Sequence, residues 1–246
     1  MSGYCPQPGS CEDLRLEYVT VSVGFDDLLD HTLCANRAHC DTVIVVTSHG
    51  DRKTQALCRK HSVTCVPTDL MTKDNRHFNK GAAINAGMNY FRFYGWRMHL
   101  DADIMLPKTF RQVLFNHTTL DRSVLYGADR VNVIGKKQIH RLMLCEAHQH
   151  NHSFLVESGC RRDLGARYCD LLSGYLPLGF FQMWHATQQR NYPWSLGSAA
   201  HDDIMFSMLW PREKRQLLPT AVVYHLCPDE PQMGQNWEGR KSRRLK

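Results

Sequence analysis

Two aspartates separated by one alanine have the spacing in this chain that most directly suggests chemistry. Asp101 and Asp103 directly follow a short apolar strand predicted over 96–100. Residues two apart on an extended chain point to the same side, so both carboxylates can approach one ion. Carboxylate and phosphate oxygens are the usual ligands of Mg²⁺ and Mn²⁺. The pattern therefore predicts a divalent-metal site at the carboxyl end of a strand. The alternative is a strand-ending turn, since Asp favours turns.

A second pair of aspartates, Asp202 and Asp203, opens a helix predicted over 202–210. Adjacent residues project in different directions, so different roles are expected for the two carboxylates. One can cap the helix N-terminus. The other can accept the proton of an incoming hydroxyl group as a general base.

The first hundred residues predict alternating strands and helices. Strands are expected at 16–23, 42–47, 63–66 and 96–100, and helices at 27–37, 51–61 and 79–92. This alternation favours a parallel α/β sheet. Later elements are expected at 108–116, 123–128, 175–185, 202–210 and 218–224. The chain is interpreted as a single domain over 1–246, with a Cys/His-rich insertion at about 130–172 and a basic C-terminal loop at 227–246.

Four segments carry a family resemblance, and they occur in the order Phe78–Gly87, Leu100–Asp103, Ser198–Asp203 and Val222–Leu226. Together they resemble motifs of the GT-A glycosyltransferases, especially the family-2-like and polypeptide-GalNAc-transferase-like branches. The resemblance implies an α/β GT-A fold with a mostly parallel central sheet flanked by helices. It also implies that Asp101, Asp103 and His225 hold Mn²⁺ or Mg²⁺. Asp203 is then the preferred catalytic base, and Asp202 is the second choice.

The same resemblance implies a nucleotide-sugar donor, with a UDP-sugar expected. A divalent ion would stabilise the charge that gathers on the leaving diphosphate. The residues expected to contact the nucleotide are Asp51, Lys80, Asn85, Asp101, Trp237, Arg240 and Lys241. The last three lie in a loop that is expected to close over the diphosphate. Retention or inversion at the sugar carbon is left open.

Composition bears on the acceptor and on the compartment. A formal charge of +6 favours a polyanionic partner. No apolar run reaches the ~18 residues of a membrane-spanning helix, and the N-terminus lacks a signal-peptide pattern. No integral membrane association is therefore expected, and the location is predicted to be cytoplasmic, in the host cytoplasm if the protein is phage-encoded. Ten cysteines are then interpreted as reduced thiols.

An acceptor in DNA fits this charge. Phage enzymes that glycosylate hydroxymethylated pyrimidines in DNA are similar in kind, and phosphate attraction would supply the affinity for such a substrate. The modified base would have to leave the helix to reach the site. Glycan, protein and small-molecule acceptors are the alternatives.

Two other classes of function are alternatives for this sequence. A sugar nucleotidyltransferase shares this architecture, but residues 21–27 lack its glycine-rich, basic phosphate loop. A non-enzymatic nucleic-acid-binding module would fold the Cys/His-rich residues 145–169 around structural Zn²⁺. Their spacing matches no standard zinc finger, so a polar surface loop is the favoured interpretation.

Overall fold

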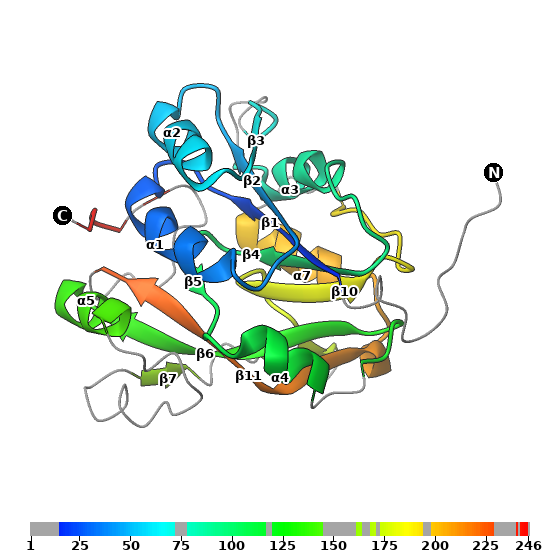
Figure 1. The fold of residues 1–246 in the computed structure, drawn as a ribbon. Coiled ribbons are helices and arrows are strands. Elements are labelled where there is room, and N and C mark those ends of the chain that lie inside the picture. Colours follow the sequence, from blue (N-terminus) through cyan, green and yellow to red (C-terminus); the bar gives the residue numbers. More distant parts are fainter. Residues whose placement is uncertain are drawn as a thin grey trace.

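A mixed β-sheet with helices on both faces forms the framework of the molecule (Figure 1). The computed structural model describes residues 15–71, 78–116, 120–144, 161–163, 168–170, 173–193, 198–228, 240 and 242–245. The strand order in the main sheet is β3-β2-β1-β4-β10-β6-β11-β5, and β7 pairs with β6. Within this described part, no helix is both long and apolar enough to cross a bilayer.

The first half of the chain forms the parallel part of the sheet. Its elements are β1 (Leu16–Val21), α1 (Asp26–Asn36), β2 (Thr42–Thr47), α2 (Arg52–His61), β3 (Thr64–Pro67), α3 (Lys80–Met88) and β4 (Trp96–Leu100). All three pairings among these strands are parallel. The predicted alternation is confirmed, and the predicted bounds of β2 and β4 coincide with the observed ones.

The second half of the chain adds antiparallel strands. Its elements are β5 (Ile104–Met105), α4 (Phe110–Asn116), β6 (Leu125–Ile134), α5 (Lys136–Leu144), β7 (Arg161–Asp163), β8 (Tyr168–Asp170), β9 (Gly174–Leu176), β10 (Phe181–His185), α7 (Ala199–Ser207), η3 (Arg212–Lys214) and β11 (Arg215–Cys227). β10 runs antiparallel between β4 and β6, whereas β11 is parallel to β6 and antiparallel to β5. The α/β class is as predicted, and the sheet as a whole is mixed.

The segment interpreted as an insertion begins inside the main sheet. β6 continues to Ile134, and α5 then covers residues 136–144. A short antiparallel contact joins β7 to β6. β8 pairs antiparallel with β9 in a separate two-stranded sheet. Residues 145–160, 164–167 and 171–172 of this stretch lie outside the described residues, as does most of the C-terminal loop.

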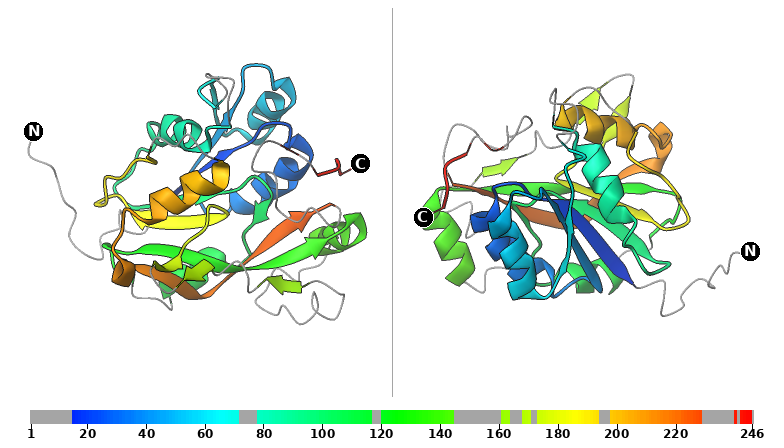
Figure 2. Two further views of the ribbon diagram at one scale, coloured as in Figure 1. Left: turned by 180° about the vertical axis from the view of Figure 1, so that it is seen from behind. Right: turned by 90° about the horizontal axis from the view of Figure 1, so that it is seen from above.

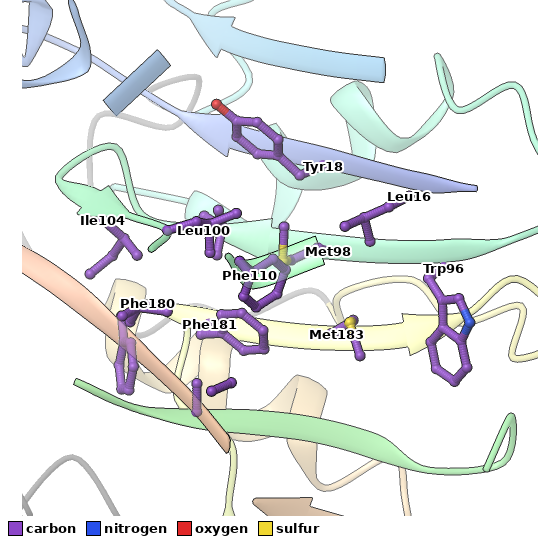
Figure 3. Packing of buried hydrophobic residues seen from close by; sticks show 14 of the residues in the cluster. Leu16, Tyr18, Trp96, Met98, Leu100, Ile104, Phe110, Phe180, Phe181 and Met183 are labelled. Atoms are coloured by element: carbon purple, nitrogen blue, oxygen red, sulfur yellow. The ribbon is translucent and has the colours of Figure 1, made fainter. Parts of the chain in front are cut away.

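The core lies on both faces of the sheet because side chains alternate along each strand. On one face Leu16 and Tyr18 of β1 belong to a cluster with Leu29 of α1 and Phe110 of α4. Figure 3 shows side chains of this cluster lying along β1, β4 and β10. On the other face the intervening Val19 packs in a cluster with α3 and α7. The view from above shows α3 and α7 on the opposite side of the sheet from α1 and α2 (Figure 2).

Candidate active site

The turn after β4 carries the two predicted metal ligands, and β11 lies directly beside it. Asp101 follows the last residue of β4, and Asp103 precedes β5. β11 pairs with β5 so that His225 lies opposite Ile104. The Leu226 N–H also donates to the Asp103 carbonyl at 2.9 Å. This short pairing places a histidine from residue 225 next to an aspartate more than a hundred residues earlier in the chain.

Helix α1 braces the same turn from the opposite side. The Thr32 hydroxyl donates to the Ala102 carbonyl at 2.8 Å. The Asn36 amide donates to the Ile104 carbonyl and accepts from the Leu106 N–H, both at 2.8 Å. Thr32 and Asn36 are both buried. The aspartate turn is therefore held by side chains that replace ordinary backbone pairing.

Asp103 and His225 form a buried pair. His225 Nε2 lies 3.4 Å from Asp103 Oδ2, and Nδ1 donates to Asn132 Oδ1 at 2.8 Å. Burial alone would lower the pKa of His225, but the charges of Asp103 and Cys227 raise it to about 10. Burial would raise the pKa of Asp103, and the neighbouring His225 and Arg130 charges hold it below its usual value. Without a bound ion, the pair is therefore an imidazolium beside a carboxylate.

Lys80 links the turn that carries Asp101 and Asp103 to helix α7. Its Nζ lies 2.7 Å from Asp101 Oδ1 and 3.1 Å from Asp203 Oδ2. Burial would lower the pKa of Lys80, but these two carboxylates raise it above its usual value. Burial raises the pKa of Asp101, while Lys80 opposes the rise and Asp103 adds to it. Three residues from three parts of the chain thus share one cluster of charges, in which Lys80 and Asp203 are buried and Asp101 is partly exposed.

The two aspartates of α7 have different surroundings. Ser198, not an aspartate, caps this helix. Asp202 Oδ2 instead accepts the Gly81 N–H at 2.8 Å, so it holds the first turn of α3. Asp203 faces Gly179, where a Cβ would lie 2.0 Å from the carboxylate. A side chain at residue 179 would therefore displace this carboxylate.

Asp203 is the aspartate of α7 with a carboxylate oxygen left over. Its Oδ1 is buried and makes no hydrogen bond to any described residue, while Oδ2 lies against Lys80. Burial raises the pKa of Asp203 to about 7; Lys80 opposes this rise, and Asp101 and Asp202 add to it. A carboxyl group with a pKa near neutrality is suited to accept a proton at neutral pH.

A buried polar chain that the sequence did not reveal supports this cluster. His99 Nδ1 lies 3.1 Å from the Tyr192 hydroxyl, which donates to Gln182 Oε1. The Gln182 amide donates to the Asp203 carbonyl at 2.9 Å. Tyr192 also stacks on Phe206 of α7, with ring centroids 3.9 Å apart. The chain connects β4, β10 and α7 behind the carboxylates. The only sequence signal for a role of His99 is its position two residues before Asp101.

The predicted nucleotide contacts fall into separate places. Asp51 caps α2 by accepting from Thr54 and also accepts the Gly24 N–H at 2.8 Å. Asn85 uses its amide to bind the main chain of Tyr192, at 2.8 and 2.9 Å. Trp237 and Lys241 lie outside the described residues. Of this group, the structure brings Lys80 and Asp101 together.

Arg240 lies at the N-terminus of α1, away from the carboxylate cluster. It pairs with both carboxylate oxygens of Asp27 and donates to the Gly24 carbonyl. Its guanidinium also lies over the Phe25 ring, 4.8 Å from the centroid. The predicted phosphate contact is thus, in this structure, an ion pair within the protein.

The side chains of Asp101, Asp103 and His225 are suitable ligands for a divalent ion, although they do not surround one point in this structure. Neighbouring ligands of one ion, each about 2.1 Å from it, lie roughly 3 Å apart, and the Asp103–His225 separation of 3.4 Å is close to this. Asp101, in contrast, is held by Lys80. Within the described ranges, no group of three or more His, Cys, Asp or Glu side chains is close enough for a common ion. Asp101 must therefore turn for all three ligands to converge.

The fold is that of known nucleotide-sugar transferases. Glucosyl-3-phosphoglycerate synthase from Mycobacterium tuberculosis, in complex with phosphoglyceric acid, matches with a TM-score of 0.53 and 12% identity over 90% of this chain and 75% of that chain. The same enzyme with Mn²⁺, UDP and phosphoglyceric acid gives a TM-score of 0.52 and 12% identity over 86% and 70% of the two chains. A mannosyl-3-phosphoglycerate synthase from Rubrobacter xylanophilus matches over 47% of this chain and 40% of its own, with 18% identity and a TM-score of 0.39.

Sequence comparison adds no family. Neither a protein-family model nor a curated protein sequence matches this chain. The structural likeness shows that the chain has the GT-A fold of nucleotide-sugar transferases. The predicted fold class is therefore confirmed.

Proposed function

We propose that this chain is a metal-dependent glycosyltransferase that moves a sugar from a UDP-sugar to an acceptor hydroxyl group. The observation that carries the proposal is the Asp203 carboxylate, which shares Lys80 with Asp101 and keeps one buried oxygen unpartnered within the described residues. The M. tuberculosis neighbour was solved with Mn²⁺ and UDP. These bound groups support the same donor chemistry for a chain of the same fold.

The chain's own residues supply the proton transfer. Asp203 Oδ1 would accept the proton of the acceptor hydroxyl, and a pKa of about 7 suits this step. Gly179 packs directly against this carboxylate, and any side chain there would displace it. When bound by Asp101, Asp103 and His225, Mn²⁺ or Mg²⁺ would act as a Lewis acid toward the leaving diphosphate.

For the acceptor, we propose a molecule that carries an anionic group close to its reacting hydroxyl. The Arg130 guanidinium lies over the Phe180 ring, 4.8 Å from its centroid, and helps to lower the pKa of Asp103. Phe180 follows Gly179, which faces Asp203. A positive charge therefore lies near both a proposed metal ligand and the proposed base, and the whole chain carries a formal charge of +6.

Two acceptors share this chemistry. The M. tuberculosis neighbour is bound to phosphoglyceric acid, a small acid with a phosphate and a carboxylate. A hydroxymethylated pyrimidine in DNA likewise presents a hydroxyl close to phosphates, and it is the acceptor proposed from the sequence. Glycan and protein acceptors without such a charge are disfavoured by the Arg130 placement.

The experiment is the release of UDP from a panel of UDP-sugars with Mn²⁺. Each donor is tested alone, with 3-phosphoglycerate, with hydroxymethylcytosine-containing DNA and with unmodified DNA. Stimulation by one anionic acceptor supports the proposal and identifies its class. Release that only a neutral glycan stimulates would contradict the anionic acceptor.

Two controls test whether the release of UDP depends on the proposed site and on the proposed reaction. Asp203→Asn should abolish release, whereas Asp121→Asn should not, because Asp121 is half-exposed and pairs with Lys214. Pyrophosphate formation from UTP and a sugar phosphate is measured in parallel, since it would indicate a nucleotidyltransferase. An absence of any nucleotide product, with stoichiometric zinc in the purified protein, would favour the non-enzymatic binding module.

A further inference from the structure

The ammonium group of Lys80 lies between two carboxylates that the proposed reaction assigns to different tasks. Its Nζ contacts Asp101 at 2.7 Å and Asp203 at 3.1 Å, and its side chain is only 8% exposed. The backbone of Lys80 is fixed, because it begins α3 and the first turn is held by Asn79 and Asp202. The ammonium group can therefore leave either carboxylate by rotation of its own flexible side chain.

A divalent ion at Asp101 would meet this resident charge. If the ion took the other oxygen of Asp101, the two cations would lie roughly 4–5 Å apart. The Coulomb repulsion between a single and a double charge at that distance opposes binding of the ion, because a partly buried site screens charges less than bulk water does. Asp103 and His225 already lie side by side, and His225 becomes a further ligand once it has given up its proton. Occupancy of the metal site therefore depends on whether Lys80 releases Asp101.

We propose that Lys80 keeps Asp101 unavailable to the divalent ion until a nucleoside diphosphate draws the ammonium group away. This inference rests on the proposed function, since it assigns the diphosphate of the donor as the group that moves Lys80. Phosphate oxygens offer Lys80 a charge-assisted partner as strong as a carboxylate. The same movement releases Oδ2 of Asp203, so the base is freed only when the donor is in place.

The position of Lys80 between the two carboxylates should couple the binding of the ion to the binding of the diphosphate, even without turnover. If the diphosphate raises the affinity for the ion, the ion must raise the affinity for the diphosphate by the same factor. Part of this coupling comes from phosphate oxygens that ligate the ion directly. The part caused by Lys80 is separable, because it acts on the affinity for the ion when no nucleotide is present.

The test is a titration with Mn²⁺, followed by the electron paramagnetic resonance signal of the free ion, with and without UDP. Wild type is compared with Lys80→Met, which keeps the length of the side chain and removes its charge. Lys60→Met is the matched control, because Lys60 pairs with Asp30 at 2.8 Å on the surface. Without UDP, Lys80→Met should bind Mn²⁺ about tenfold more tightly than wild type, and its enhancement by UDP should fall correspondingly, within the usual range of such couplings. Lys60→Met should match wild type.

The outcomes separate this inference from the proposed function. An affinity of Lys80→Met for Mn²⁺ equal to or weaker than that of wild type, in the absence of UDP, overturns the role of Lys80. If no variant and no wild-type sample binds Mn²⁺ even with UDP, the metal-dependent function itself fails. Should the variant unfold more easily, Lys80→Gln is measured beside it and the Mn²⁺-induced rise in Tm replaces the titration. A rise smaller than that of wild type would then contradict the proposal.

Discussion

At the scale of single residues, the neighbouring aspartates of α7 illustrate how one step along a helix separates two tasks. Successive side chains on a helix diverge by about 100°. Asp202 consequently reaches Gly81 at the start of α3, while Asp203 turns toward Gly179 and Lys80. The first carboxylate joins two helices, and the second retains an oxygen for chemistry.

This difference predicts opposite results for the two substitutions to Asn. Asp203→Asn should lower the rate of UDP release by about 10²–10⁴-fold, because the general base is lost, and should leave UDP binding intact. Asp202→Asn keeps an oxygen that can accept from Gly81, so its rate should stay within a few-fold of wild type. Both rates are measured with saturating donor. A loss of activity in Asp202→Asn alone would move the assignment of the base by one residue.

His39 offers a pH-dependent test of the fold itself. Burial and the nearby Arg111 charge lower the pKa of His39 to about 4, so the folded protein resists a proton that the unfolded chain binds near pH 6.5. Stability should therefore fall as the pH drops from about 6.5 toward 4. The loss attributable to His39 should be about 2.5 kcal/mol at pH 4.5.

The measurement is urea unfolding at pH 7 and pH 4.5 for wild type and for His39→Phe. The phenyl ring retains the edge contact with Phe110, whose centroid is 6.0 Å from that of His39, but has no proton to gain. The variant should lose less stability on acidification than wild type does. Equal losses in the two proteins would show that His39 is protonated as readily in the folded state as in the unfolded state.

Residue types and spacing predicted the candidate site residues, but not the side chains that hold them in place. Asp101 and Asp203 could be predicted from the sequence because each belongs to a pair of closely spaced carboxylates, at the end of a strand or the start of a helix. Asn85 was predicted to contact nucleotide, which stays a prediction, and its amide binds the backbone of Tyr192, which was not predicted. That partner lies 107 residues away, and no local pattern indicates it.

At the scale of elements, α1 acts as a brace for the turn that carries Asp101 and Asp103, the proposed metal ligands. Local sequence predicts α1 well, because its apolar residues recur at helical spacing. The same sequence does not reveal that Thr32 and Asn36 substitute for missing backbone partners of residues 102–106. Two buried polar residues on the inner face of a helix indicate such a task only when the opposing loop is known.

Asn36→Ala should therefore be costly. It would leave the Ile104 carbonyl and the Leu106 N–H without their buried partner, at roughly 1–3 kcal/mol for each group. Unfolding by urea should show a loss of about 2–4 kcal/mol, and Mn²⁺ binding should weaken because the aspartate turn loosens. Asn89→Ala, at the exposed end of α3, is the matched control and should change stability by less than about 0.5 kcal/mol. Similar losses in the two variants would remove the bracing role.

Strand order shows where local patterns stop being informative. The four parallel strands could be predicted because helices separate them in the sequence. A helix between two strands carries the chain back so that the next strand runs parallel to the first. β10 inserts antiparallel between β4 and β6 instead. Its apolar residues predict a buried strand, but the choice of neighbours depends on contacts between segments roughly eighty residues apart.

At the scale of the whole molecule, the described residues near the C-terminus pack against the first helix. Arg240 binds Asp27 at the N-terminus of α1, and the Leu245 N–H donates to the same carboxylate. Figure 1 shows the C-terminal end lying beside α1. The sequence predicted a basic loop here, and its charge suggested a phosphate partner. The described contact spans 213 residues and engages an acidic helix start instead.

Removal of Arg240 should therefore destabilise the fold before it affects the nucleotide. The side chains of Arg240 and Asp27 are each 9% exposed, and removing one member of such a buried pair costs about 3–5 kcal/mol. Arg240→Met should accordingly lower the free energy of unfolding by several kcal/mol, whereas Arg243→Met, at an exposed position, should have little effect. Asp27→Asn together with Arg240→Met should recover part of the loss, because no unpaired charge remains. If Arg240→Met instead leaves stability unchanged and weakens UDP binding at least tenfold, Arg240 serves the diphosphate, as the sequence first predicted, and its pairing with Asp27 is replaced when the donor binds.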